Sequence, residues 1–434
     1  MKRKYILFIA ALPLVMLSNC GKTGNGELIG VQGRAPWYQP DPYGMLFVPM
    51  GSFNMGPSDQ DVPYSQTAQS RTVSVQAFYI DQTEITNNEY RQFVYWVKDS
   101  IARRILGGEL DEERWLITTN FYDEELEPPR INWTERIDWA EAEQREVLLQ
   151  MFLPEHEQFY RRKELDTRKL DFEYYWIDLQ EASKRSNREQ GLKDRSVFIK
   201  RDVINVYPDT LAWIRDFTYS FNEPMTNMYF WHPAYDNYPV VGVNWKQARA
   251  FCIWRTELLN NFLASHGGSF VQNFRLPSES EWEYASRGGL DHSPYPWGGP
   301  YIRNANGCFL GNFKPMRGNY IDDGGFHTVV VTSYSPNEYG LYCMAGNVAE
   351  WTSNAFDESA YNFSHDLNPD YQYDAQETDP PALKRKVIRG GSWKDIGYYM
   401  QTGTRTYEYQ DTAKSYIGFR CVMSYLGRAK GDEL

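Results

Sequence analysis

A twelve-residue stretch, GLYCMAGNVAEW at Gly340–Trp351, is the most informative segment of the chain. It is followed by RGGSW at Arg389–Trp393 and by GFRC at Gly418–Cys421. The glycines suit backbone with positive φ, and the segment lacks the spacing of a long helix or strand. Aromatic residues make up 16% of the chain, so we expect a core built from Tyr/Trp-rich loops as much as from regular elements.

Earlier segments of the chain add further motifs. MLFVPMGSFNMG spans Met45–Gly56, and a helix is predicted to begin after Thr86, with Glu89 completing a capping box. YPVVGVNW at Tyr238–Trp245 opens another predicted helix, and RLPSESEWEYA spans Arg275–Ala285. Large aromatic side chains in such motifs are usually core rather than ligand contacts, so we expect burial of Trp245, Trp282 and Trp351.

In this order, the motifs resemble the formylglycine-generating-enzyme (sulfatase-modifying factor) family. The resemblance covers residues 45–94 and 235–425. It implies an α+β domain of the C-type-lectin-like kind with little regular secondary structure. Residues 426–434 form a short C-terminal tail.

The resemblance also shows where catalysis should occur. Active members convert a substrate cysteine to formylglycine with two thiols that follow the Gly-Gly-Ser motif and bind Cu(I). Here those positions are Asp395 and Met400. A carboxylate is a hard ligand and a thioether cannot be deprotonated, so neither replaces a thiolate for a soft metal. We therefore expect no catalytic residues. The chain also lacks HExxH and phosphate-loop motifs, and we interpret the carboxylates of Arg275–Glu283 as structural.

The same family implies structural calcium, which prefers oxygen ligands. One site would use the side chain of Glu350 with backbone carbonyls of Ala345, Gly346 and Val348. The alternative for Glu350 is a buried carboxylate satisfied by backbone N–H groups. A second site would use Asn306 and Asp323, although Asn306 matches the family only after a one-residue shift.

Four cysteines lie beyond the N-terminal region: Cys252, Cys308, Cys343 and Cys421. Some secreted family members join cysteines at the positions of Cys252 and Cys421, so the resemblance implies a disulfide there. Cys308 and Cys343 are expected to stay free. The alternative is that all four are small buried side chains without a bridge.

The N-terminus predicts export and lipid anchoring. Lys2, Arg3 and Lys4 precede an apolar run that is too short to span a bilayer, as in a signal peptide over residues 1–19. Leu17-Ser18-Asn19-Cys20 resembles a bacterial lipobox with Cys20 as the acylated residue. The alternative is an ordinary signal with a chance cysteine. Residues 20–44 form a Gly/Pro-rich tether. No acidic run follows Cys20, which favours the periplasmic face of the outer membrane.

Residues 95–234 interrupt the family domain. Residues 101–200 hold 17 Lys/Arg and 23 Asp/Glu, far above the 24% charged residues of the whole chain. They are also rich in aromatics, unlike a disordered linker. Asp138–Leu153 and Glu155–Lys184 have few Gly and Pro residues, so we expect a largely helical insertion. It is either a solvated decoration or a partner-binding element.

The net charge of −12 makes nucleic acid an unlikely partner class. GPSD at 56–59, TEITNNEYRQFV at 83–94 and YPDTL at 207–211 resemble lipoproteins of the GldK/PorK type, a branch of the family that lacks the two catalytic thiols. That resemblance implies a non-catalytic subunit of the type IX secretion and gliding machinery, in a periplasmic ring with a GldN/PorN-type protein, with further copies of itself and with other outer-membrane components. The sister lipoprotein GldJ, a periplasmic ligand-binding module and an active oxidase are the alternatives.

Overall fold

The computed structural model describes residues 38–57, 69–120, 122–189, 195–216, 224–315 and 319–427. Asp41–Gly427 form one compact unit. Cys20, the signal segment, most of the tether and the last seven residues lie outside the described part. Within that part, no helix combines the length and the apolar character needed to cross a membrane.

The regular elements are short apart from two helices. The helices are α2 (Asn87–Glu109), α3 (Glu112–Trp115), α4 (Ala142–Leu148), α5 (Leu179–Ser183), α6 (Arg185–Glu189), α7 (Ala212–Asp216), α8 (Pro224–Met228), α9 (Trp245–Ser265), α10 (Glu279–Arg287) and α11 (Ala360–Phe363). The strands are β1 (Met45–Val48), β2 (Gly51–Met55), β3 (Arg71–Val75), β4 (Phe78–Asp81), β5 (Leu116–Thr119), β6 (Glu125–Ile131), β7 (Asp171–Ile177), β8 (Ile199–Asn205), β9 (Phe274–Arg275), β10 (Ala349–Ala355), β11 (Arg385–Arg389), β12 (Thr406–Tyr409), β13 (Ile417–Gly418) and β14 (Val422–Ser424).

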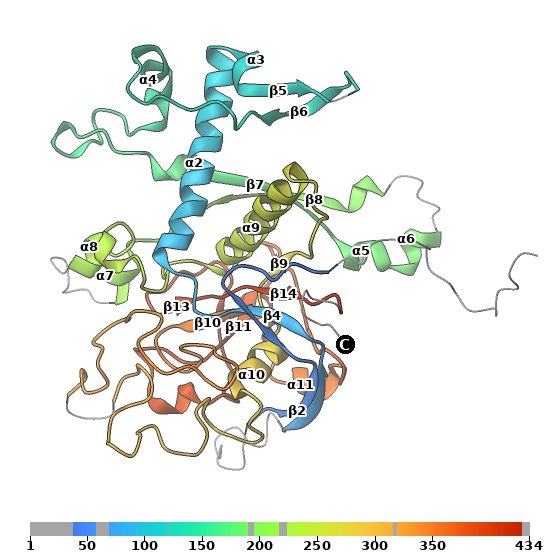
Figure 1. Ribbon diagram of the computed structural model, residues 1–434, viewed down its shortest axis with the longest axis vertical. Coiled ribbons are helices and arrows are strands. Elements are labelled where there is room, and N and C mark those ends of the chain that lie inside the picture. The colour runs from blue at the N-terminus through green and yellow to red at the C-terminus, as the bar shows by residue number, and fades with distance from the viewer. Residues whose placement is uncertain are drawn as a thin grey trace, which may run out of the picture. The chain divides into compact units, whose positions relative to one another are not determined.

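One four-stranded sheet, in the order β1-β4-β14-β9, lies between two apolar clusters. Successive residues of a strand point to opposite faces. Tyr79 of β4 therefore packs in one cluster with Phe93 of α2 and Phe251 of α9, whereas Ile80 packs in the other with Trp282 of α10. Helices thus cover both faces of this sheet (Figure 1).

A second four-stranded sheet, in the order β12-β11-β10-β13, joins three of the motifs. Glu350 on β10 pairs in register with Arg389 on antiparallel β11 and with Gly418 on parallel β13. Segments far apart in the sequence therefore meet at Glu350. As expected, the motif tryptophans are buried: Trp245, Trp282 and Trp351.

Between α10 and β10 the described chain, 289–315 and 319–348, forms no helix or strand. This long irregular segment agrees with the sequence-based expectation of an α+β domain rich in loops. Its backbone is held by turns and by side chains such as Asn337, which bridges the end of α10 and the loop itself.

The insertion differs from its prediction. Thr86 and Glu89 form the expected capping box at the start of α2, and this helix runs on into the insertion. Beyond it, the antiparallel hairpins β5–β6 and β7–β8 alternate with helices of four to seven residues (Figure 1). Most of Glu155–Lys184 forms irregular turns and β7. The prediction of a largely helical insertion is wrong, because alternating apolar residues such as Phe172, Tyr174 and Trp176 bury one face of a strand.

Candidate functional site

The loop after β11 holds Asp395 and Met400, the two residues at which the sequence resemblance predicts the thiols of active members. Gly390 and Gly391 have φ values of 91° and 67°, a region that favours glycine. A Cβ on Gly391 would lie 2.8 Å from the backbone of Tyr399. The loop from Gly391 to Met400 is therefore closed on itself by backbone contact.

Asp395 is held by one hydrogen bond from its own loop and by another from Lys314. The Ser392 hydroxyl donates to its Oδ2 at 2.6 Å, and its backbone carbonyl accepts from the Lys314 N–H at 2.8 Å. Burial raises the pKa of Asp395. The carboxyl group thus caps a turn.

Met400 lies in the core. Its side chain is fully buried in a cluster with Tyr295, Phe313 and Ala345. A Cβ on Gly311 would lie 2.7 Å from the Met400 methyl group, so the methionine fills space that this glycine leaves open. Met400 is therefore a packing residue in this chain.

The insertion contacts this same loop. Trp213 of α7 stacks on Trp393, with ring centroids 5.8 Å apart. Asp216 at the end of α7 approaches Lys394 at 3.3 Å and accepts a hydrogen bond from Ser415. The insertion therefore contacts Trp393 and Lys394, the two residues that precede Asp395.

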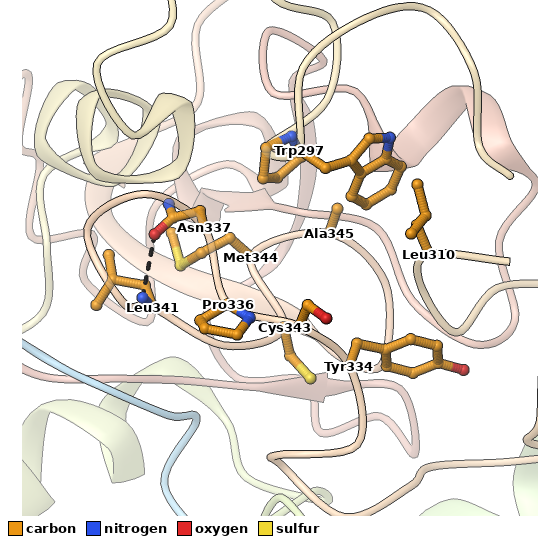
Figure 2. A pocket seen from close by; sticks show the side chains of 11 residues that line it. Trp297, Leu310, Tyr334, Pro336, Asn337, Leu341, Cys343, Met344 and Ala345 are labelled. Carbon is orange, nitrogen blue, oxygen red and sulfur yellow. Dashed lines mark hydrogen bonds between the residues drawn. The ribbon is translucent and has the colours of Figure 1, made fainter. Parts of the chain in front are cut away.

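A small cavity adjoins the Met400 cluster, with which it shares Trp297 and Ala345. Figure 2 shows it between the 334–345 loop and Trp297. Its volume, about 20 Å³, suits a water molecule rather than a peptide side chain. Cys343 contributes to its wall, and burial raises the pKa of that thiol, which keeps it protonated and unreactive.

Glu350 is the predicted side-chain ligand for calcium. The structure instead pairs it with Arg420, which donates at 2.7 and 2.6 Å, and with the Trp282 indole N–H at 2.7 Å. The carboxylate is thus satisfied by side chains rather than by backbone N–H groups. Because the guanidinium supplies the positive charge that a cation would bring, Glu350 as arranged does not fit Ca²⁺.

The other predicted calcium site would use Asp323 and Asn306, which differ in burial. Asp323 is buried, its carboxylate accepts hydrogen bonds from the Phe313 and Gly325 N–H groups, and burial raises its pKa. Asn306 is exposed. No group of three or more His, Cys, Asp or Glu side chains that could hold a metal occurs among the described residues. Calcium binding stays a prediction.

A buried carboxyl group that the sequence did not single out lies beside Glu350. Glu84 is fully buried and accepts from the Asn347 amide at 2.8 Å and from the Val348 N–H at 3.3 Å. Burial and then the charge of Glu350 raise the pKa of Glu84. The TEITN motif around Glu84 was the only sequence signal for a special role. The composition of that segment does not distinguish a buried glutamate from a surface one.

The carboxylates of α10 are each paired with arginine. Glu281 pairs with Arg275, Glu279 with Arg405, and Glu283 with both Arg287 and Arg389. All three glutamates hold the fold through these pairs, as we interpreted them from the sequence.

Most of the chain matches a known domain family. Residues 35–425 match the model of the FGE-sulfatase family, the sulfatase-modifying factor enzyme 1-like domain. The chain belongs to this family.

Similar proteins include some named formylglycine-generating enzyme and some named as its inactive form. The inactive C-alpha-formylglycine-generating enzyme 2 of Bos taurus is 35% identical over 202 residues, which cover 45% of this chain and 53% of that protein. The formylglycine-generating enzyme of Bos taurus is 25% identical over 401 residues, which cover 91% of this chain and 78% of that enzyme. The structure of PvdO from Pseudomonas aeruginosa covers 88% of this chain and 94% of its own, with 17% identity and a TM-score of 0.46. The chain spans about half the length of the inactive relatives it matches.

Proposed function

We propose that this member of the sulfatase-modifying factor family is a non-catalytic structural protein. The proposal rests on the side chains of Asp395 and Met400, which stand where the resemblance predicts two thiols. Asp395 caps its own turn and Met400 fills the core, so neither offers a thiolate to Cu(I). The cavity lined by Met344 and Ala345, about 20 Å³, is too small for a substrate cysteine.

The structural role that the sequence motifs favour is in the type IX secretion and gliding machinery. The chain is then a GldK/PorK-type lipoprotein, anchored through Cys20 on the periplasmic face of the outer membrane. It forms a ring with a GldN/PorN-type protein and further copies of itself. The insertion, anchored beside the former catalytic loop through Trp213 and Asp216, supplies assembly contacts rather than a passive decoration.

The test is extraction of the tagged chain from outer membranes in detergent. We expect large rings in electron micrographs, with a second periplasmic protein as the main companion by mass spectrometry. A chain that purifies alone as a small particle, together with unchanged protein secretion in a deletion strain, would refute the proposal. Saturable binding of a small ligand in that situation would favour the ligand-binding alternative.

A further inference from the structure

The loop between α4 and β7 borders a cavity of about 570 Å³, a volume within the usual range of ligand sites. Its lining combines apolar side chains, including Leu149 and Phe152, with the bases Lys163, Arg168 and Lys169. Leu149 is 42% exposed, so apolar surface is open to solvent there. Such a lining suits a peptide segment that carries both an aromatic and acidic side chains.

The part of this loop that leads to Lys163 is exposed, aromatic and basic. Phe159 is 68% exposed and Tyr160 is 83% exposed, and their rings meet edge to face. Arg161, Arg162 and Lys163 follow and are exposed, and none of these three bases forms an ion pair within the described part of the chain. Aromatic side chains and arginine are enriched at protein interfaces. We call these five residues, together with the cavity, the basic site.

The acids of this loop do not cancel its positive charge. Of its four acids, Glu157 and Asp166 are both held by Arg168. The other two, Glu155 and Glu164, stand against the three consecutive bases of the basic site. The chain as a whole carries a net charge of −12. The basic site is therefore a positive surface on an acidic protein, and an occupant that carries carboxylates is complementary to it.

The end of the hairpin β5–β6 carries the opposite charge. Residues 119–129 contain no Lys or Arg and hold four acids: Asp123, Glu124, Glu125 and Glu127. All four acids are exposed, and none forms an ion pair among the described residues. Tyr122 beside them is 78% exposed. Residues 122–127, which we call the acidic tip, therefore present one aromatic ring next to four carboxylates.

Both surfaces are fixed to the same end of α2. Trp115, which precedes β5, and Met151, near the start of the loop that forms the basic site, are buried with Leu106 of α2 in one apolar cluster. Figure 1 shows the hairpin and the loop on opposite sides of α2. Held in this way, the acidic tip and the basic site of one chain do not meet. A contact between them requires two copies.

We propose that the acidic tip of one copy of this chain binds the basic site of the next copy. Tyr122 of the first copy then packs on the apolar lining of the cavity beside Tyr160 of the second copy. The carboxylates of the tip face the bases at 161–163. Aromatic pairs and complementary charges both favour such a contact. The contact is head-to-tail, so it repeats from copy to copy and makes a ring when the rotation closes.

The inference rests on the ring proposed above and names the contact between neighbouring copies. A second copy supplies acidic tips and basic sites in equal numbers, so every surface finds a partner in a closed ring. The contact and the ring can fail separately. Rings that persist without the contact would refute this inference alone, whereas open chains of copies joined by the contact would refute only the closed ring.

The test is disulfide cross-linking of full-length copies in membranes, with Cys308→Ser in every copy because Cys308 is exposed. One copy carries Tyr122→Cys and another carries Glu155→Cys, at an exposed residue of the cavity lining. The two copies have different tags and are oxidised together. We expect a covalent dimer that carries both tags and disappears on reduction. The matched control replaces Tyr122→Cys by Tyr175→Cys, at a tyrosine of β7 that is 51% exposed. Absence of the mixed dimer, or an equal yield from the control, would overturn the proposal.

A charge exchange distinguishes a second copy from another acidic partner. Glu124→Lys/Glu125→Lys makes the tip more basic, and Arg161→Glu/Arg162→Glu makes the site more acidic. We expect either pair of changes, placed in both members of the cysteine pair, to lower the cross-link yield by roughly tenfold or more, because like charges then meet. Both pairs in the same chain should restore the yield, since opposite charges again face one another. A combined variant no better than either pair alone, with all variants folded by circular dichroism, would refute the contact between copies.

Discussion

The Sγ atoms of Cys252 and Cys421 lie 3.4 Å apart, although 169 residues separate them in the chain. Cys252 is on α9 and Cys421 precedes β14, and both are buried. Burial, and then the contact with Cys252, raise the pKa of the Cys421 thiol. The two thiols are not bonded in this structure, but they are within reach of one another.

We expect these thiols to form a disulfide when the chain is exported to an oxidising compartment. Closing so long a loop stabilises a fold by roughly 4–5 kcal/mol on the chain-entropy model. Peptide mapping without reductant should recover a 252–421 linked peptide, and Cys421→Ser should lower the free energy of unfolding. Cys308 and Cys343 should be alkylated once the chain is denatured. Recovery of Cys252 and Cys421 as free thiols from exported protein would contradict the bridge.

Lipidation of Cys20 is a separate prediction, because this residue lies outside the described part of the structure. Membrane protein should carry a mature N-terminus at Cys20 with attached acyl chains, detected by mass spectrometry. More than one acyl chain gives stable anchoring, so Cys20→Ser should shift the protein to the soluble or uncleaved fraction. An unmodified N-terminus in wild-type membranes would contradict this prediction.

Restoring the two thiols should not restore an enzyme. In Asp395→Cys/Met400→Cys, the second thiol would be buried among Tyr295, Phe313 and Ala345, where burial disfavours the thiolate that Cu(I) requires. With copper, oxygen and a cysteine-containing sulfatase peptide, we expect no aldehyde from wild type or variant. The variant should also lose stability, by less than the about 2–5 kcal/mol that truncation of a buried methionine to alanine costs, because cysteine leaves part of the Met400 space empty. Aldehyde above background from the wild type would contradict a non-catalytic role, whereas aldehyde from the variant alone would contradict only the argument that burial disables a thiol at position 400.

The sequence predicted the family domain well because its motifs carry local signals. Capping residues such as Thr86 and Glu89 and the glycines at 390 and 391 specify backbone directly. The sequence predicted the insertion but not its secondary structure, since its short strands were obscured by a high charge content. Nor could it assign Glu350, whose pairing with Arg420 depends on a parallel contact between β10 and β13. Long-range register is set by the whole fold and leaves little trace in local spacing.

Buried arginine–glutamate pairs should be a main support of this loop-rich domain. Glu283 accepts from Arg287 and from the Gly56 N–H at 2.8 Å, and it pairs with Arg389, whose side chain is fully buried. Removing one partner leaves a buried charge unpaired, which costs about 3–5 kcal/mol. We expect this loss in Glu283→Gln by urea unfolding. The exposed Glu358→Gln, which removes the partner of Arg385, should cost under about 1 kcal/mol. Equal costs for the two variants would refute a special role for the buried pairs.

Lys386 on β11 is a buried lysine. Its ammonium group lies 3.8 Å from the centre of the Trp245 ring and donates to the Tyr373 carbonyl at 2.7 Å. Burial lowers the pKa of Lys386 to about 8, and the nearby charge of Asp374 opposes this shift only in part. The unfolded chain keeps an ordinary lysine pKa of about 10.4.

Stability should therefore rise with pH in the window between these two values. Above pH 8 the folded state releases the Lys386 proton while the unfolded state still binds one, and unfolding then takes up a proton. The free energy of unfolding increases by up to roughly 1.4 kcal/mol per pH unit from this group, until the unfolded lysine also titrates. Urea unfolding at pH 7.5 and pH 9.5 should show this increase in wild type and a smaller one in Lys386→Met. Lys163→Met, at an exposed lysine in the insertion, is the control and should keep the wild-type increase. An equal increase in Lys386→Met and wild type would contradict a lowered pKa for Lys386.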